Sequence, residues 1–124
     1  MSAAKYTFTF EQGTTIDVEM LYKSSGSNTP IDLTGYGAKM QIKSNYADKN
    51  PRTFLTLSSS LNADNTGLTL GGPSGSIRLF VSAATSSAAL NFDTAFYDLE
   101  ITTSTGIVTR LLEGPVKIKR EVTR

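Results

Sequence analysis

The side chains that could do chemistry in this sequence are hydroxyls and carboxylates. Serine and threonine supply a quarter of the 124 residues, whereas histidine and cysteine are absent. A hydroxyl needs an adjacent base to become a nucleophile, and histidine is the commonest such base. Without cysteine the chain has no thiolate nucleophile, disulfide or zinc-thiolate site. The composition therefore predicts a non-enzymatic protein with no catalytic residues, no cofactor and no small-molecule substrate.

Two pairs of carboxylates are the remaining candidates for catalysis, Asp17 with Glu19 and Asp98 with Glu100. Glycoside hydrolysis needs two carboxyl groups that flank a cleft. Each pair is spaced i, i+2 and alternates with apolar residues, so in a strand both members lie on the solvated face. We interpret them as a polar outer face that can form cross-strand ion pairs. The basic residues available for these pairs are Lys39, Lys43, Arg110 and Lys117.

Two loops have compositions that occur in ligand sites. The segment Gly71 to Gly75 is rich in glycine, but neither a Lys-Ser/Thr pair nor a helix start follows it, so a hairpin turn is the better interpretation. Residues 62–65 offer oxygen ligands for calcium, yet they lack the glycine and the distal glutamate of a helix-loop-helix calcium site. We predict no metal site in either loop.

The basic residues near the end of the chain are candidates for an interaction surface. The formal net charge is only +1, so contact with nucleic acid would need a local patch. Acidic neighbours and the lack of a stacked aromatic pattern argue against nucleic acid. A solvated strand end is the simplest interpretation, and docking against an acidic neighbouring subunit is the functional one, with 119–124 a flexible or docking tail. The candidate residues are Lys117, Lys119, Arg120 and Arg124.

Tyr46 and Arg52 are the other two candidate interaction residues. Both lie in the polar segment 44–52, which contains Asn50-Pro51 and is predicted to be an exposed loop. Tyr46 lies outside the alternating apolar pattern, unlike Tyr22, Tyr36 and Tyr97, so it is the tyrosine best placed to serve as a glycan platform.

The elements that must position these residues are strands. Apolar and polar residues alternate with period two, which places one set on a buried face and the other in solvent. The segment 82–91 differs because it is rich in alanine and begins with Ser82, a good N-cap, so it predicts one short helix ending near Asn91. Gly114-Pro115 interrupts the last strand and predicts a sheet edge or a bulge there. Strands are predicted at 6–10, 16–22, 38–43, 54–57, 68–70, 77–81, 97–101 and 108–118.

About eight short strands at regular spacing predict an all-β fold, an immunoglobulin-like β-sandwich formed by residues 1–124 as a single domain with one short helix near Ser82–Asn91. A small barrel or jelly roll is the alternative. Pro30 to Tyr36 predicts a corner in which Asp32 or Thr34 bonds the turn backbone. Apolar stretches fall far below the roughly 20 residues of a membrane span, so we expect neither a membrane partner nor a secretion signal.

The order of these motifs resembles structural proteins of tailed bacteriophages, in particular the immunoglobulin-like module at the N-terminus of baseplate upper proteins. The resemblance is carried by 6–10, 11–19, 30–36, 38–43, 75–79, 82–90, 96–101 and 109–114. It implies a virion structural protein, assembled in the bacterial cytoplasm and present in multiple copies in the tail, baseplate or head-tail region. The implied partners are other phage structural proteins and further copies of the chain. A capsid decoration or host-glycan-binding module is the alternative function.

Overall fold

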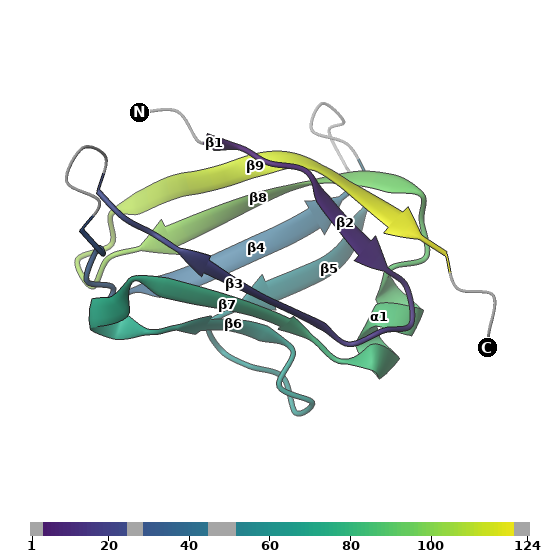
Figure 1. The fold of residues 1–124 in the computed structure, drawn as a ribbon, viewed down its shortest axis with the longest axis horizontal. Coiled ribbons are helices and arrows are strands. Elements are labelled where there is room, and N and C mark those ends of the chain that lie inside the picture. The colour runs from purple at the N-terminus through teal and green to yellow at the C-terminus, as the bar shows by residue number, and fades with distance from the viewer. Residues whose placement is uncertain (1–3, 25–28, 45–51, 121–124) are drawn as a thin grey trace.

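The computed structural model describes residues 4–24, 29–44 and 52–120, which form two β-sheets packed face to face (Figure 1). Among these residues are nine strands, one α-helix, α1 (Ala83–Ala89), and one short 3-10 turn at Gly72–Ser74. The strands are β1 (Ala4–Lys5), β2 (Phe8–Glu11), β3 (Ile16–Leu21), β4 (Gly37–Lys43), β5 (Thr53–Ser58), β6 (Gly67–Leu70), β7 (Ser76–Val81), β8 (Thr94–Thr102) and β9 (Val108–Lys119).

The larger sheet has six strands and the smaller has three. In the larger sheet β1 and β2 follow one another along the same side of β9, and β8, β4 and β5 complete the order. The smaller sheet has the order β3-β7-β6. Neighbouring strands are antiparallel, except that β1 and β2 run parallel to β9. The prediction of an all-β sandwich is confirmed.

The predicted elements correspond closely to the observed ones. The first predicted strand, 6–10, corresponds to β2, whereas the two-residue β1 that precedes it was not predicted. The predicted hairpin between 68–70 and 77–81 is the antiparallel pair of β6 and β7. Ser82 caps α1 as predicted, because its hydroxyl accepts the N–H of Thr85 at 3.2 Å. The helix ends one residue earlier than predicted, with Leu90 as its C-terminal cap in place of Asn91.

The alternating apolar residues of both sheets form the core. Met40, Ile42 and Leu99 of the larger sheet and Leu79 of the smaller one are almost completely buried. An aromatic group fills one part of this core, where the Phe8 ring lies 4.9 Å from the ring of Tyr97. Since strands alternate with period two, the same pattern that buries these residues leaves the intervening polar residues on the two outer faces.

The predicted corner before β4 is confirmed. The carboxylate of Asp32 accepts hydrogen bonds from the N–H and the hydroxyl of Thr34, at 2.9 and 2.6 Å, and these bonds lower the pKa of Asp32. Gly35 adopts a φ of 82°, a conformation that a glycine reaches without strain. Leu33 is 1% exposed, so it anchors the corner in the core.

The prediction of an edge or bulge at Gly114-Pro115 is wrong in its position. β9 has β8 on one side, and on the other it pairs with β1 at Leu112–Glu113 and with β2 at Val116–Lys119, so Gly114-Pro115 lies in an internal part of the strand. The bulge lies at Leu111, because Leu99 pairs with Leu112 while Glu100 pairs with Arg110. Pro115 has no N–H to donate, and it lies opposite the break between β1 and β2.

In the ranges that the structure describes, no helix is long and apolar enough to cross a membrane.

Candidate functional site

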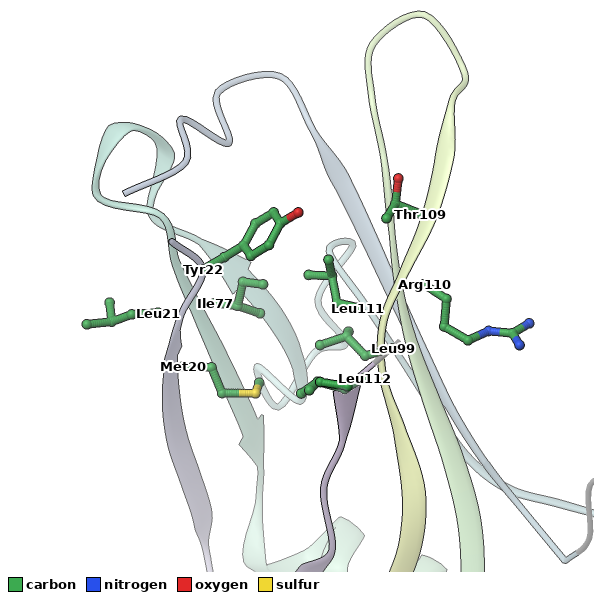
Figure 2. Close-up of a pocket in the computed structure, with 10 residues that line it drawn as sticks. Met20, Leu21, Tyr22, Ile77, Leu99, Thr109, Arg110, Leu111 and Leu112 are labelled. Atoms are coloured by element: carbon green, nitrogen blue, oxygen red, sulfur yellow. The ribbon is translucent and has the colours of Figure 1, made fainter. Parts of the chain in front are cut away.

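One side of the sandwich lies open between β3 and the β1–β9 pair. Of the described strands, β3 pairs only with β7, so its other edge faces solvent. A pocket of about 280 Å³ opens between the two sheets at the same place (Figure 2). On the opposite side of the sandwich β5 and β6 are in contact. We call the free edge of β3 together with this pocket the open seam, and it is the candidate functional site.

The pocket of the open seam has apolar walls. Figure 2 shows side chains from both sheets converging on it, with the side chains of Arg110 and Leu21 directed away. The bulge at Leu111 explains why β9 gives the pocket so much apolar surface, because an extra residue in a strand interrupts the alternation of side chains between the two faces of the sheet. Two successive leucines of β9 therefore line the pocket. The converging apolar residues are Met20, Tyr22, Ile77, Leu99, Leu111 and Leu112.

The free edge of β3 presents main-chain groups as well as side chains. The N–H of Tyr22 donates to the carbonyl of Gly75 at 2.8 Å. This bond shows which residues of β3 direct their main-chain groups toward β7. Because bonding alternates along an antiparallel pair, every second residue of β3 directs its N–H and C=O away from β7. These residues are Asp17, Glu19 and Leu21, and their groups form the kind of row to which another strand can pair.

The side chains on the outer face of β3 carry a net negative charge. Asp17 forms a two-point ion pair with Arg78 of β7, at 2.8 and 2.7 Å, and these hydrogen bonds lower the pKa of Asp17. Glu19 lies directly opposite Arg78 in the strand register, but in the described part of the chain the guanidinium forms its ion pair with Asp17. The Arg78 guanidinium also lies 5.3 Å from the centre of the Phe80 ring. The prediction of a basic partner for Asp17 is wrong, because its carboxylate contacts Arg78 of β7, which was not among the predicted partners.

The second predicted pair of carboxylates lies on the outer face of the larger sheet. Arg110 lies 3.6 Å from Asp98 and 3.4 Å from Glu100, as predicted, and 3.9 Å from Glu113. Glu113 is also paired with Lys5, and this hydrogen bond lowers its pKa. Burial raises the pKa of Asp98. Because both candidate carboxylates contact one guanidinium across neighbouring strands, their arrangement is that of an ion-pair network.

Arg110 is the only one of the four predicted basic partners to approach a carboxylate within 4 Å in the described part of the chain. Lys39, Lys43 and Lys117 do not form the predicted ion pairs there. Lys39 lies directly opposite Glu100 in the register of β4 and β8, yet the carboxylate is contacted by Arg110 from β9. The longer, planar guanidinium reaches several carboxylates at once, which an ammonium does less well.

The candidate residues at the basic end lie at the far end of β9. Lys117 and Lys119 are exposed on the outer face of the larger sheet. Arg120 bonds to Asp93 at 3.2 Å and also to Asn91, in the segment that follows α1. The structure therefore brings Arg120 against a carboxylate of its own chain. Arg124 and Glu121 lie outside the described residues, as does most of the predicted tail 119–124.

Arg52 contacts an aromatic pair that includes Phe92 of the same segment. Its guanidinium is 5.2 Å from the centre of the Phe54 ring, and that ring stacks on Phe92 at 4.4 Å. Arg120 thus contacts residues 91 and 93 directly, whereas Arg52 is linked to this segment through the Phe54 ring. Tyr46, the predicted glycan platform, lies outside the described residues, so its role stays a prediction.

The loop that could have held calcium is instead a cap for α1. The carboxylate of Asp64 accepts the hydroxyls of Ser82 and Thr85, at 2.5 and 2.6 Å, and the N–H of Thr66 at 3.0 Å. These bonds hold the pKa of Asp64 far below its usual range. Within the described ranges no group of three or more acidic side chains is arranged to hold a metal ion.

No known family model and no curated protein matches this sequence. The candidate site therefore depends on the geometry of the open seam. Sequence reasoning missed this seam, although two signals pointed to it. Leu21 occupies a position where the alternation of β3 calls for a polar residue, and it is 54% exposed. The adjacent Leu111 and Leu112 similarly depart from period two.

Proposed function

We propose that this protein is a non-enzymatic structural protein of a tailed-phage virion that assembles in multiple copies through its sheet edges. The observation that carries the proposal is the unpaired edge of β3 beside an apolar pocket. An exposed sheet edge is a template for pairing with another chain, and proteins that stay monomeric usually block such edges. An apolar pocket at the same place gives a partner both main-chain bonds and buried area.

The strand order supports an immunoglobulin-like identity for the sandwich. Immunoglobulin variable domains extend the G, F and C strands with C′ and pack them on a sheet that contains B, E and D. In this chain the order β9-β8-β4-β5 corresponds to GFCC′, and β3-β7-β6 corresponds to BED. The phage setting is supported by the order of the sequence motifs, which resembles that of baseplate upper proteins. The partners are then other virion proteins and further copies of the chain.

The test is mass spectrometry of purified particles of the phage that encodes the chain, followed by cryo-EM to locate the copies. We expect the chain in the particles in multiple copies, at the tail, baseplate or neck. Copies found on the capsid surface would favour the decoration alternative. Absence of the chain from the particles would overturn the proposal.

A pair of variants tests the role of the seam in assembly. Leu21→Lys places a charge at the open seam, so we expect fewer copies in the particles. Leu61→Lys is the matched control, because Leu61 is 45% exposed and lies against Gly67 of β6, at the other edge of the smaller sheet. Equal incorporation of both variants would show that assembly does not use the open seam.

A further inference from the structure

We propose that the open seam accepts an extended segment of a different protein, which adds to β3 as a fourth strand and carries a basic residue opposite Glu19 and apolar residues at the neighbouring inward positions. This inference rests on the proposed function, because it names the chemistry of the partner that the seam would take in an assembly.

The main chain of β3 provides the row of bonds. Asp17, Glu19 and Leu21 direct their N–H and C=O groups to the open edge. In constant-type immunoglobulin sheets, strand A occupies the position beside strand B. In this chain β1 and β2 both lie beside β9, so the described residues place no strand beside β3. An added strand would therefore extend the smaller sheet at the position of strand A.

The pocket determines which side chains such a strand needs. In a sheet, residues that lie opposite each other point to the same face. A residue opposite Glu19 would thus point to the outer face, and one opposite Met20 would point between the sheets. There the pocket of about 280 Å³ is lined by Met20, Leu111 and Leu112, so the inward positions favour apolar side chains. Figure 2 shows these three side chains facing the pocket from its two sides.

The charges of β3 disfavour a second copy of this same edge as the partner. Two copies of β3 that pair antiparallel over most of their length would place Glu19 opposite Glu19, or Asp17 opposite Glu19. Like charges directly opposite each other destabilise a sheet. Arg78 forms its two-point ion pair with Asp17, so a basic residue of the added strand opposite Glu19 would neutralise the second carboxylate of β3. The geometry thus favours a segment in which basic residues alternate with apolar ones.

The experiment uses a synthetic peptide, acetyl-Thr-Val-Lys-Val-Lys-Leu-Thr-amide, labelled for fluorescence polarisation and titrated with the full chain. We expect saturable binding that weakens as salt is added, because exposed charges are screened. Replacing both lysines of the peptide by glutamate, or its valines and leucine by serine, should abolish binding. Glu19→Lys in the protein should weaken binding about tenfold or more. Glu11→Lys is the matched control, since Glu11 is exposed on β2 in the other sheet, and it should leave binding unchanged.

A second pair of probes tests the main-chain bonds without altering the protein. Alternate residues of a strand bond on opposite sides, so N-methylation of the peptide at one set of alternate residues should abolish binding, while N-methylation of the other set should preserve it. The inference is overturned by equal binding of both N-methylated peptides, by unchanged binding to Glu19→Lys, or by no binding at about 1 mM. A dimer of the peptide-free chain that Glu19→Lys alters would overturn it too, because a second copy would then be the occupant.

The outcomes separate this inference from the proposed function. If the chain is found in virions and the peptide does not bind, the strand-addition inference fails and the structural role stands. If the peptide binds as expected and the chain is absent from virions, the seam is a strand-binding site and the virion proposal fails.

Discussion

The hydroxyl of Tyr97 donates a hydrogen bond to the main-chain carbonyl of Tyr6 at 2.8 Å, at the point where the ladder between the N-terminal strands and β9 is broken. The N–H of Tyr6 donates to the carbonyl of Glu113 at 3.1 Å. In a parallel ladder the carbonyl of Tyr6 would next accept the N–H of residue 115. That residue is Pro115, which has none. The buried Tyr97 hydroxyl therefore takes the place of the missing donor.

Tyr97→Phe should lower the free energy of unfolding by about 1–2 kcal/mol, because it leaves the Tyr6 carbonyl without this donor. Urea denaturation followed by circular dichroism measures the change. Pro115→Ala returns an N–H at the break, so the same Tyr97→Phe substitution should cost less in that background. If Tyr97→Phe lowered the free energy of unfolding equally in both backgrounds, the Tyr97 hydroxyl would not be replacing the missing N–H of residue 115.

Gly114→Ala should be among the most destabilising single changes in the chain. A Cβ at this position would lie 2.2 Å from the carbonyl oxygen of Tyr6, and the residue has a φ of 156°. We expect a loss of about 2–3 kcal/mol, in the range of overpacked sites. Gly37→Ala is the control, since its nearest atom would be 3.6 Å away at Ser59. Thermal denaturation should show a lower Tm for the first variant, and similar Tm values would refute the close approach.

Ser86→Ala should loosen the turn between β2 and β3. Ser86 is completely buried, and its hydroxyl oxygen accepts the N–H of Gly13 at 3.0 Å. Leaving that N–H without an acceptor should cost about 1–2 kcal/mol. Hydrogen exchange of the Gly13 amide should also become faster. Thr14→Ala removes an exposed turn bond to Glu11, so its effect should stay below about 0.5 kcal/mol. Unchanged exchange in Ser86→Ala would contradict the docking of this turn on α1.

Asp64→Asn should make the stability of the protein less sensitive to acid. The folded-state pKa of Asp64 is lowered from its ordinary value of 3.8, so the carboxylate contributes stability above that value and loses it as the pH falls below 3.8. The wild-type chain should therefore lose more stability than Asp64→Asn between about pH 5 and pH 2.5. Urea midpoints at these two pH values provide the comparison.

Asp98→Asn should change the pH dependence of stability in the opposite direction to Asp64→Asn. Burial raises the folded-state pKa of Asp98 above 3.8, so ionisation of this group reduces stability as the pH rises through the interval between 3.8 and the folded value. In the wild-type chain, protonation of Asp98 at low pH favours the folded state, and Asp98→Asn lacks this contribution. Asp98→Asn should therefore lose more stability than the wild-type chain on acidification, and a smaller loss would contradict the raised pKa.

Most of the fold could be predicted because its signals are local. The alternation at Ile16 to Tyr22 specifies a strand whichever neighbour it pairs with, and the Ser82 cap and the 31–36 corner depend on residues close in sequence. The contacts of the basic end were less predictable. Arg120 is basic in sequence, yet it bonds to Asp93, 27 residues away, which no local pattern reveals.

The sequence by itself determined the strands of this protein and which of their faces are buried. Its period-two pattern requires strands that bury one face, and its lack of histidine and cysteine limits the side chains available to hydroxyls, carboxylates, amides and basic groups. The tertiary structure decided which edges those strands leave free. Because β1 and β2 pair with β9, one edge of β3 has no partner among the described strands, and the bulge at Leu111 turns two leucines toward the pocket. Strand pairing and bulges are set by contacts between residues far apart in the chain, so the open seam emerges only when the sheets assemble.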